Sequence, residues 1–188
     1  MIRILFKETV PPEDFENFAQ NQSWKLVEHF PETPEQEEEF VWETSSGIDI
    51  HRVHNRTMGL SYTVIEGGPE ETRVRDVVIS FESAFSLYSH TEVLEMYRTS
   101  SFWDEKVLTM PMVALSAPHN FNEETFNTIL SSFEDSHENV RYAGVVATYY
   151  VPWKEFIPPL LLVTQNDPDA DIRMAANDAV ANLRRHNA

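Results

Sequence analysis

Short runs of β-branched and aromatic residues dominate the first part of the chain. Apolar and polar residues alternate in several of these runs, a period of two that is typical of strands with one buried face. Turn-forming residues separate them, as at Ser45-Ser46-Gly47 and Asn55-Arg56-Thr57. The pattern predicts five or six strands, at residues 2–7, 24–30, 40–44, 48–53, 59–65 and 72–81.

One helix is predicted among these strands. Pro11-Pro12-Glu13-Asp14 supplies the proline and the acidic residues that favour a helix start, and Phe15, Phe18 and Ala19 follow at helical spacing. The later strands follow one another through short turns, so we expect a mainly antiparallel sheet arranged as a meander. Residues 1–82 are therefore predicted to form an α+β unit.

The hydrophobic period changes at residue 83. Apolar residues now recur three or four positions apart, and no further strand signal appears. The first stripe of this kind consists of Ala84, Leu87, Tyr88, Thr91 and Leu94. We predict a helical unit over residues 83–188, packed on the N-terminal unit because no low-complexity linker separates the two.

An internal repeat of 32 residues organises the helical unit. The aligned segments are 120–123 with 152–155, 129–130 with 161–162, and 135–143 with 167–175. Each copy predicts a helix, a tight turn at Asp135 or Asp167, and a second helix. Residues 120–123 are predicted to form a capping box at the start of their helix.

The last copy resembles a HEAT repeat. Ile157-Pro158-Pro159-Leu160-Leu161 is similar to the proline-containing first helix of that family. Asp167-Pro168-Asp169-Ala170-Asp171-Ile172-Arg173, with alanines soon after, is similar to its turn and second helix. The preceding copy departs from the pattern at Ser136, which replaces the turn proline, and at Gly144, which stands where Ala176 does.

The resemblance implies a short HEAT-like α-solenoid of two to three helix pairs. A degenerate first pair would span residues 83–98 and 104–117, with Thr109 at the position of the family arginine. Together with the N-terminal sheet, this gives an α+β fold. The resemblance does not extend to residues 1–82.

The repeat places small, large apolar and charged residues at equivalent positions, each with a role in packing. Small residues would let adjacent second helices approach closely: Ala143, Gly144, Ala147, Ala175, Ala176 and Ala179. Four larger ones are predicted to fill the space between the two helix layers: Leu130, Phe133, Leu161 and Leu162. Asp135 and Asp167, with Arg141 and Arg173, are spaced to form a ladder of charge-assisted hydrogen bonds between neighbouring copies.

The chain is strongly acidic, with 31 Asp and Glu against 14 Lys and Arg and a formal charge of −17. Such a charge repels phosphate backbones, so we expect no direct nucleic-acid binding and favour a basic protein partner. Alternatively, the charge only maintains solubility. The chain has no cysteine, no apolar stretch near the roughly 20 residues of a membrane span and no basic leader, so we expect a cytoplasmic location without membrane contact.

No sequence signature of catalysis, metal binding or cofactor binding occurs. None of the 7 histidines lies in a His-Glu-x-x-His motif or a similar cluster, and no cysteine could complete a metal site. Glycine-rich nucleotide loops and Gly-x-Ser-x-Gly are also absent. We predict no catalytic residue, no metal and no cofactor; an enzyme would have to assemble its site from dispersed residues.

A group of basic residues stands out against the acidic background: His51, Arg52, His54, Arg56, Arg73 and Arg75. They lie in two neighbouring predicted strands. Such a group can bind a carboxylate or a phosphate. The interpretation we favour is that its arginines pair across strands with Glu39, Glu43 or Glu71.

The repeat also predicts a binding surface. Equivalent positions on successive second helices form columns, and these helices line the concave side of a HEAT-like stack, where Met and Tyr suit recognition of a peptide or helix. The predicted partner-binding residues are Met110, Val113, Tyr142, Val145, Tyr149, Met174 and Asn177. The alternative is that other parts of the protein cover these columns.

The sequence therefore favours a protein-binding or scaffold module. Two alternatives remain. One is an acidic inhibitor or immunity-type protein that covers a basic partner, which salt should weaken strongly. The other is a HEAT-like enzyme such as a tetrapyrrole lyase, which a copurified chromophore would reveal.

Overall fold

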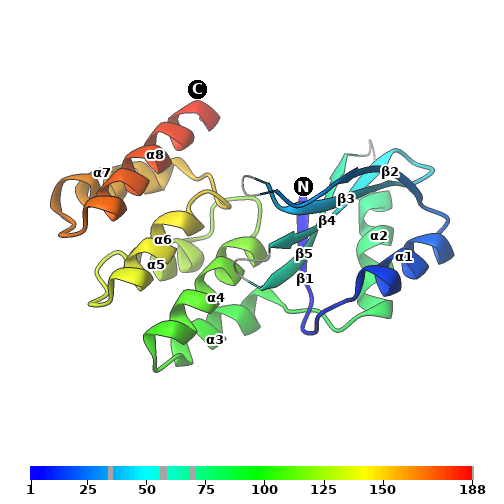
Figure 1. Ribbon diagram of the computed structural model, residues 1–188, viewed down its shortest axis with the longest axis horizontal. Helices are drawn as coiled ribbons and strands as arrows, with labels where there is room; N and C mark the ends of the chain where they lie inside the picture. Colours follow the sequence, from blue (N-terminus) through cyan, green and yellow to red (C-terminus); the bar gives the residue numbers. More distant parts are fainter. Residues whose placement is uncertain (34–35, 56–58, 68–70, 188) are drawn as a thin grey trace. The chain divides into compact units, whose positions relative to one another are not determined.

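The structure, a computed structural model, describes residues 1–33, 36–55, 59–67 and 71–187 (Figure 1). Strands and helices in these residues make the fold α+β, as predicted. The chain divides into two compact units, residues 1–88 and 89–188, called unit 1 and unit 2 below. The boundary predicted after residue 82 lies inside helix α2 (Glu71–Ala84).

Unit 1 contains an antiparallel sheet, with five strands in the described residues. These are β1 (Ile2–Leu5), β2 (Lys25–Phe30), β3 (Glu38–Glu43), β4 (Ile48–Asn55) and β5 (Leu60–Gly67). Their order is β1-β5-β4-β3-β2, so β2 to β5 form the predicted meander and β1 adds to β5. Five of the predicted strands are thereby confirmed.

The β3–β4 connection confirms the predicted turn at Ser45-Ser46-Gly47. Gly47 adopts a φ of 71°, which glycine reaches without steric cost. Its N–H donates to the carbonyl of Thr44 over 3.0 Å, and the hydroxyl of Thr44 accepts the N–H of Ile48 over 3.0 Å. The second predicted turn, at residues 55–57, extends outside the described residues.

Helix α1 (Pro12–Asn21) is confirmed as predicted. Pro12 occupies its first position, where no backbone N–H is needed, and Glu13 and Asp14 lie in the first turn. Phe15, Phe18 and Ala19 are buried. The helical spacing of these three residues therefore identified the face that packs on the sheet.

The strand predicted at residues 72–81 is wrong, because these residues form helix α2. Alternating β-branched and charged residues suggested a strand, but Val74, Val77, Val78, Phe81 and Phe85 also recur at helical spacing. All five pack in the core of unit 1. Packing of these side chains in the core of unit 1 therefore overrides the local β propensity of the segment.

The core of unit 1 lies between α1, α2 and one face of the sheet. Ile4, Trp42, Ile50 and Ile65 supply that face. Aromatic rings from the helices meet them: the ring centroids of Phe15 and Trp42 are 4.8 Å apart. Those of Phe18 and Phe81 are 5.0 Å apart.

Arg52 lies on this same buried face and is only 4% exposed. Its Nη2 donates to the carbonyl of Val10 over 3.1 Å, and its guanidinium lies 5.9 Å from the centroid of Phe15 and 6.0 Å from that of Phe40. Burial lowers the pKa of Arg52, and the charge of Glu38 acts in the opposite direction. The predicted pairing of Arg52 with Glu39, Glu43 or Glu71 across the sheet is wrong.

The predicted basic cluster is not formed as expected. Arg73 and Arg75 lie on helix α2, and Arg56 lies outside the described residues. His51 contacts Glu39 on the neighbouring strand, with Nδ1 2.5 Å from Oε1. No group of converging arginines therefore remains in the described part of unit 1.

Unit 2 is helical. Its helices are α3 (His90–Thr99), α4 (Trp103–Ser116), α5 (Glu123–Ser132), α6 (Glu138–Ala147), the 3-10 helix η1 (Lys154–Phe156), α7 (Ile157–Asn166) and α8 (Ala170–His186). They form three successive pairs, and the second helices α4, α6 and α8 pack side by side. The predicted repeat is therefore present as repeated helix pairs.

The predicted helix starts in unit 2 need two corrections. The stripe from Ala84 to Leu94 is not one helix, because Leu87 forms a β-bridge with Phe6 and α3 begins only after Ser89. A capping box at Ser89 and Glu92 fixes that start. The cap of α5 is Asn122, not a box over residues 120–123; its side chain accepts the N–H of Thr125 over 2.9 Å.

Side-chain burial in the helix pairs differs from the prediction by one or two positions. Phe133 is buried as expected, and Leu130 and Leu161 are half-buried. Leu162 is 61% exposed, so its predicted place between the layers is wrong. Ile129 and Leu160 are the fully buried residues at these levels.

Gly144 allows a close approach, but within one helix pair. A Cβ at this position would lie 1.8 Å from the Oγ of Ser132, which is on α5. The predicted role of Gly144 between adjacent second helices is therefore wrong. Ala147, Ala176 and Ala179 are buried on the second helices, as the packing argument requires.

Candidate binding groove

A ladder of ion pairs links the turns and second helices of unit 2. Arg141 holds Asp167 of the next pair with two hydrogen bonds, from Nε over 2.8 Å and from Nη2 over 3.1 Å. Its Nη1 donates to the carbonyl of Asp135 in its own turn over 3.1 Å. This confirms the predicted ladder between these two pairs.

The first pair joins the ladder through Lys106 instead of the predicted position at Thr109. Lys106 lies on α4, one helical turn before Thr109, and its Nζ is 2.7 Å from the Oδ2 of Asp135. Thr109 donates its hydroxyl hydrogen to the carbonyl of Glu105 in its own helix. A cation therefore contacts each turn aspartate from the preceding pair.

Asp167 is the more deeply buried of the two turn aspartates, with its side chain 3% exposed. Burial alone would raise the pKa of its carboxyl, but hydrogen bonds from Arg141 and from the N–H of Asp169 outweigh burial and lower it. Asp167 is therefore ionised and bonded in the folded state. The ladder fixes α6 and α8 relative to one another.

A groove of about 810 Å³ runs between α6 and α8. One side is formed by Glu138, Asn139, Tyr142, Val146 and Tyr149, and the other by Asp169, Asp171, Ile172, Met174, Ala175 and Asp178. These residues recur three or four positions apart on their helices, so each helix presents one stripe to the groove. Three of the predicted partner-binding residues, Tyr142, Tyr149 and Met174, are among them.

The groove exposes large apolar side chains. Tyr142 is 47% exposed, Tyr149 41% and Met174 62%. Several apolar side chains exposed in one groove form a patch, and aromatic residues and methionine are common at recognition surfaces. The structure therefore brings together three of the predicted residues on one accessible surface.

The groove is also acidic. Glu138, Asp169, Asp171 and Asp178 line it, and its lining residues, all in the described part of the chain, include no lysine or arginine. Asp169 additionally caps α8, since its Oδ1 accepts the N–H groups of Asp171 and Ile172 over 2.8 and 3.2 Å. Sequence analysis missed these acids.

Tyr149 is placed next to one of these carboxylates. Burial raises the pKa of its hydroxyl, the negative charge of Asp178 and the neighbouring Tyr142 raise it further, and the positive charge of Arg185 acts in the opposite direction. The Tyr149 ring is thus neutral at ordinary pH. The groove thus combines two aromatic rings with a carboxylate.

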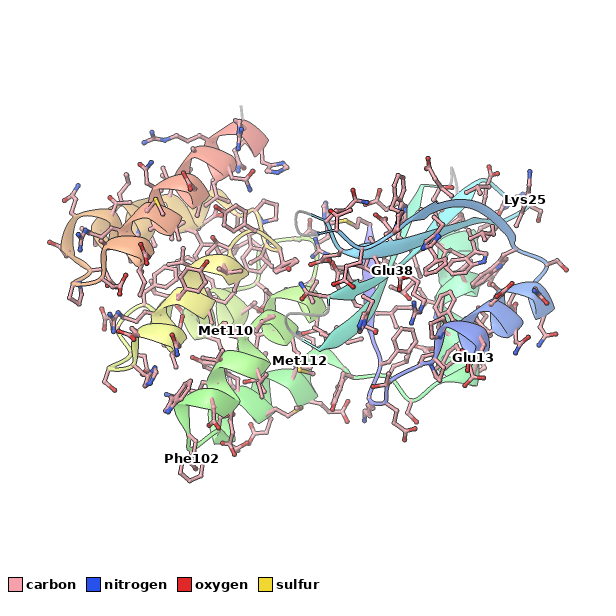
Figure 2. The ribbon with its side chains drawn as sticks, in the orientation of Figure 1. Glu13, Lys25, Glu38, Phe102, Met110 and Met112 are labelled. Carbon is pink, nitrogen blue, oxygen red and sulfur yellow. The ribbon has the colours of Figure 1, made fainter. Side chains whose placement is uncertain are left out.

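The other predicted binding residues do not line the groove. Met110, Val113 and Val145 are fully buried, so their assignment to a binding surface is wrong. Figure 2 shows Met110 inside the helical unit, whereas Phe102 at the start of α4 points outward. Helix α6 packs against both α4 and α8, and α4 packs against α3 and α6, so these three side chains lie among packed helices.

Asn177 occupies the position on α8 equivalent to the buried Val145 on α6. It is exposed but is not among the groove residues. A polar, exposed residue therefore stands on α8 where α6 has a buried valine. Its predicted role in partner binding is therefore not supported by its position.

In the described residues, no three His, Asp or Glu side chains converge as they would around a metal ion. No described helix has the length and apolar character needed to cross a membrane. Comparison with known proteins finds no matching family model, no matching curated protein and no matching solved structure.

Proposed function

We propose that unit 2 is a short HEAT-like solenoid that serves as a protein-binding module, with the groove between α6 and α8 as its binding surface. The observation that carries the proposal is the exposure of Tyr142, Tyr149 and Met174 in one groove of about 810 Å³. A groove of this size accommodates several side chains of a peptide or helix. The cytoplasm is the compartment we propose, since a chain without cysteine fits a reducing environment.

The groove has the properties of an interface centre. Aromatic side chains contribute much of the binding energy at protein interfaces, and methionine adapts to partners of different shape. The walls are held by the Arg141–Asp167 pair, whose side chains are only 12% and 3% exposed. A partner therefore meets a surface that is already formed, which lowers the entropic cost of binding.

Selection of random twelve-residue peptides on the immobilised protein tests the proposal. Peptides that bind should lose about thirtyfold in affinity, roughly 2 kcal/mol, when Tyr142→Ser and Met174→Ser are combined, because a ring and a flexible side chain are removed from the interface. Affinity is measured by fluorescence anisotropy. The melting temperature should change little, since both side chains are exposed.

Leu108→Ser is the matched control. Leu108 is 62% exposed, as Met174 is, but lies on α4 outside the groove. Its substitution should leave peptide affinity unchanged. The proposal fails if no peptide is selected, or if the selected peptides bind the double variant as tightly as the original protein.

A further inference from the structure

Two carboxylates of the groove differ from the other aspartates of the helix pairs in having no internal partner. Asp135 is paired with Lys106 and Asp167 with Arg141. Asp171 and Asp178 are exposed on α8 and, within the described part of the chain, their carboxylates form no ion pair or side-chain hydrogen bond. Their negative charge is therefore available to a molecule that enters the groove.

Arg173, the arginine of α8 next to Asp171 in the sequence, does not pair with either carboxylate. The Nη1 of Arg173 donates to the carbonyls of Asp167 and Pro168, over 2.6 and 3.0 Å, so its guanidinium is held at the turn. Arg173 is also absent from the groove lining. The carboxylates of Asp171 and Asp178 thus face the groove without an ion pair to a described cation, and Arg185, which acts electrostatically on Tyr149, lies outside the groove lining.

The apolar residues of the groove suit the same kind of ligand. The faces of Tyr142 and Tyr149 can attract a cation, and an interaction of this type is stronger with guanidinium or ammonium groups close to the ring. Met174 offers an apolar surface for the methylene stem of a long basic side chain. The two tyrosine rings lie on one wall of the groove, and Met174 with the carboxylates of Asp171 and Asp178 lies on the other.

From this arrangement we propose that the groove recognises an arginine or lysine side chain presented by a peptide segment of a protein partner. The inference rests on the proposed function and specifies the chemistry of its partner. A neutral apolar segment would leave Asp171 and Asp178 without partners, and an acidic segment would be repelled by all four carboxylates of the groove. The basic segment satisfies both the rings and the charges.

A peptide array in matched pairs tests this. Each pair has arginine at the centre of one peptide and citrulline, its neutral isostere, in the other, with varied apolar flanking residues. The labelled protein should bind the arginine members at least about tenfold more tightly, since a groove carboxylate gains a charged partner. Anisotropy titrations of the best peptide at low and high salt should show weaker binding at high salt.

The variant Asp171→Asn/Asp178→Asn should remove this preference, bringing the arginine peptide to the affinity of its citrulline counterpart. Glu95→Gln/Glu123→Gln is the matched control, because both glutamates are exposed and lie outside the groove, and the net charge changes by the same amount. The control should keep the preference for arginine. Equal loss in both variants would show that only the overall charge matters and would overturn the inference.

The preference for a basic side chain can be disproved while the proposed peptide binding still holds. If arginine and citrulline peptides bind equally, yet both lose affinity in Tyr142→Ser/Met174→Ser, the groove binds peptides but does not select a cation. If neither pair of groove substitutions alters binding, both proposals are wrong. An arginine preference lost in both groove variants supports the two together.

Discussion

The two units bury their apolar side chains in different ways. Unit 1 has one cluster of aromatic rings to which Phe6 and the elements β3, α1 and α2 contribute, so residues distant in sequence must meet at one place. Unit 2 buries mostly aliphatic and small residues between helices that follow one another. Non-local cores fail as a whole, whereas stacked pairs depend mainly on their neighbours.

The buried polar contacts of the two units also differ. Unit 1 buries Arg52 against a carbonyl and two rings, whereas unit 2 places a cation and a carboxylate at each junction between pairs. Loss of one ring should therefore strongly destabilise unit 1. In unit 2, single junction contacts should matter according to their burial.

The largest effect is expected for Phe81→Ala in unit 1. Phe81 is fully buried and its ring contacts those of Phe6, Phe15 and Phe18, so its removal leaves a cavity that the sheet cannot close. The free energy of unfolding should fall by about 3–5 kcal/mol, measured by urea titration. Ile79→Ala, on the same helix but 47% exposed, should cost well under 1 kcal/mol. Similar costs for both would contradict the single-cluster account.

Asp167→Asn should be the most damaging change at a junction of unit 2. The amide cannot match the charge of Arg141, whose side chain is 12% exposed, and removal of one member of a buried pair costs about 3 kcal/mol. Glu124→Gln breaks the Arg98–Glu124 pair, whose side chains are 48% and 54% exposed, and should cost less than about 1 kcal/mol. The same urea titration separates the two. Equal costs would show that burial does not rank the junction contacts.

Gly144→Ala should destabilise by about 1–3 kcal/mol, through the clash of its new methyl group with Ser132. Helix propensity alone would predict a gain of about 1 kcal/mol, so the sign of the change is diagnostic. Adding Ser132→Ala should recover part of the loss, because the atom 1.8 Å from the new Cβ is the serine hydroxyl oxygen. Thermal melts of the three proteins measure this. A more stable Gly144→Ala protein would mean that α5 and α6 are not so close.

The smallest effect should come from the titration of His90. Its ring bridges α4 and α5, with Nδ1 2.9 Å from the hydroxyl of Ser116 and Nε2 2.7 Å from that of Thr125. Burial lowers the pKa of His90, and the charge of Glu124 acts in the opposite direction. The folded state therefore favours neutral imidazole.

This stabilisation should be complete above the ordinary histidine pKa of about 6.5 and should be lost as the pH falls below it. Urea titrations at several pH values between 7.5 and 5 would measure the slope. His90→Gln should have a smaller decrease in stability over this range than the original protein. If His90→Gln leaves the pH dependence of the free energy of unfolding unchanged, His90 does not contribute to it.

The sheet of unit 1 could be predicted because alternation and turn residues are local signals. Gly47 and the runs around it specify β3 and β4 without knowledge of the rest of the fold. Helix α2 could not be assigned in this way, because Val77 and Phe81 fit both periods. Their contacts with residues from α1 and the sheet select the helix.

The repeat correctly predicted that Tyr142 and Met174 share one surface, because its 32-residue spacing identifies equivalent positions on successive helices. It could not show that Met110 and Val145 are buried, because equivalent positions differ in exposure from one helix pair to the next: Met110 is buried, whereas Tyr142 and Met174 are exposed. The groove acids were missed for another reason. In a chain with 31 acidic residues, the spacing of Asp171 and Asp178 has no statistical weight, although both share a helical stripe with Met174.

The location of the groove across a junction has a consequence for local opening. Helices α7 and α8 form the last described pair, and Arg141–Asp167 connects that pair to α6. Amide hydrogens in α8 should therefore exchange with solvent through an opening that separates α8 from α6 and breaks this pair. A peptide bound to both walls must dissociate first, so it slows this exchange by a factor of one plus the ratio of its free concentration to its dissociation constant. At one hundred times its dissociation constant, the peptide would add about 2.7 kcal/mol to the free energy of that opening.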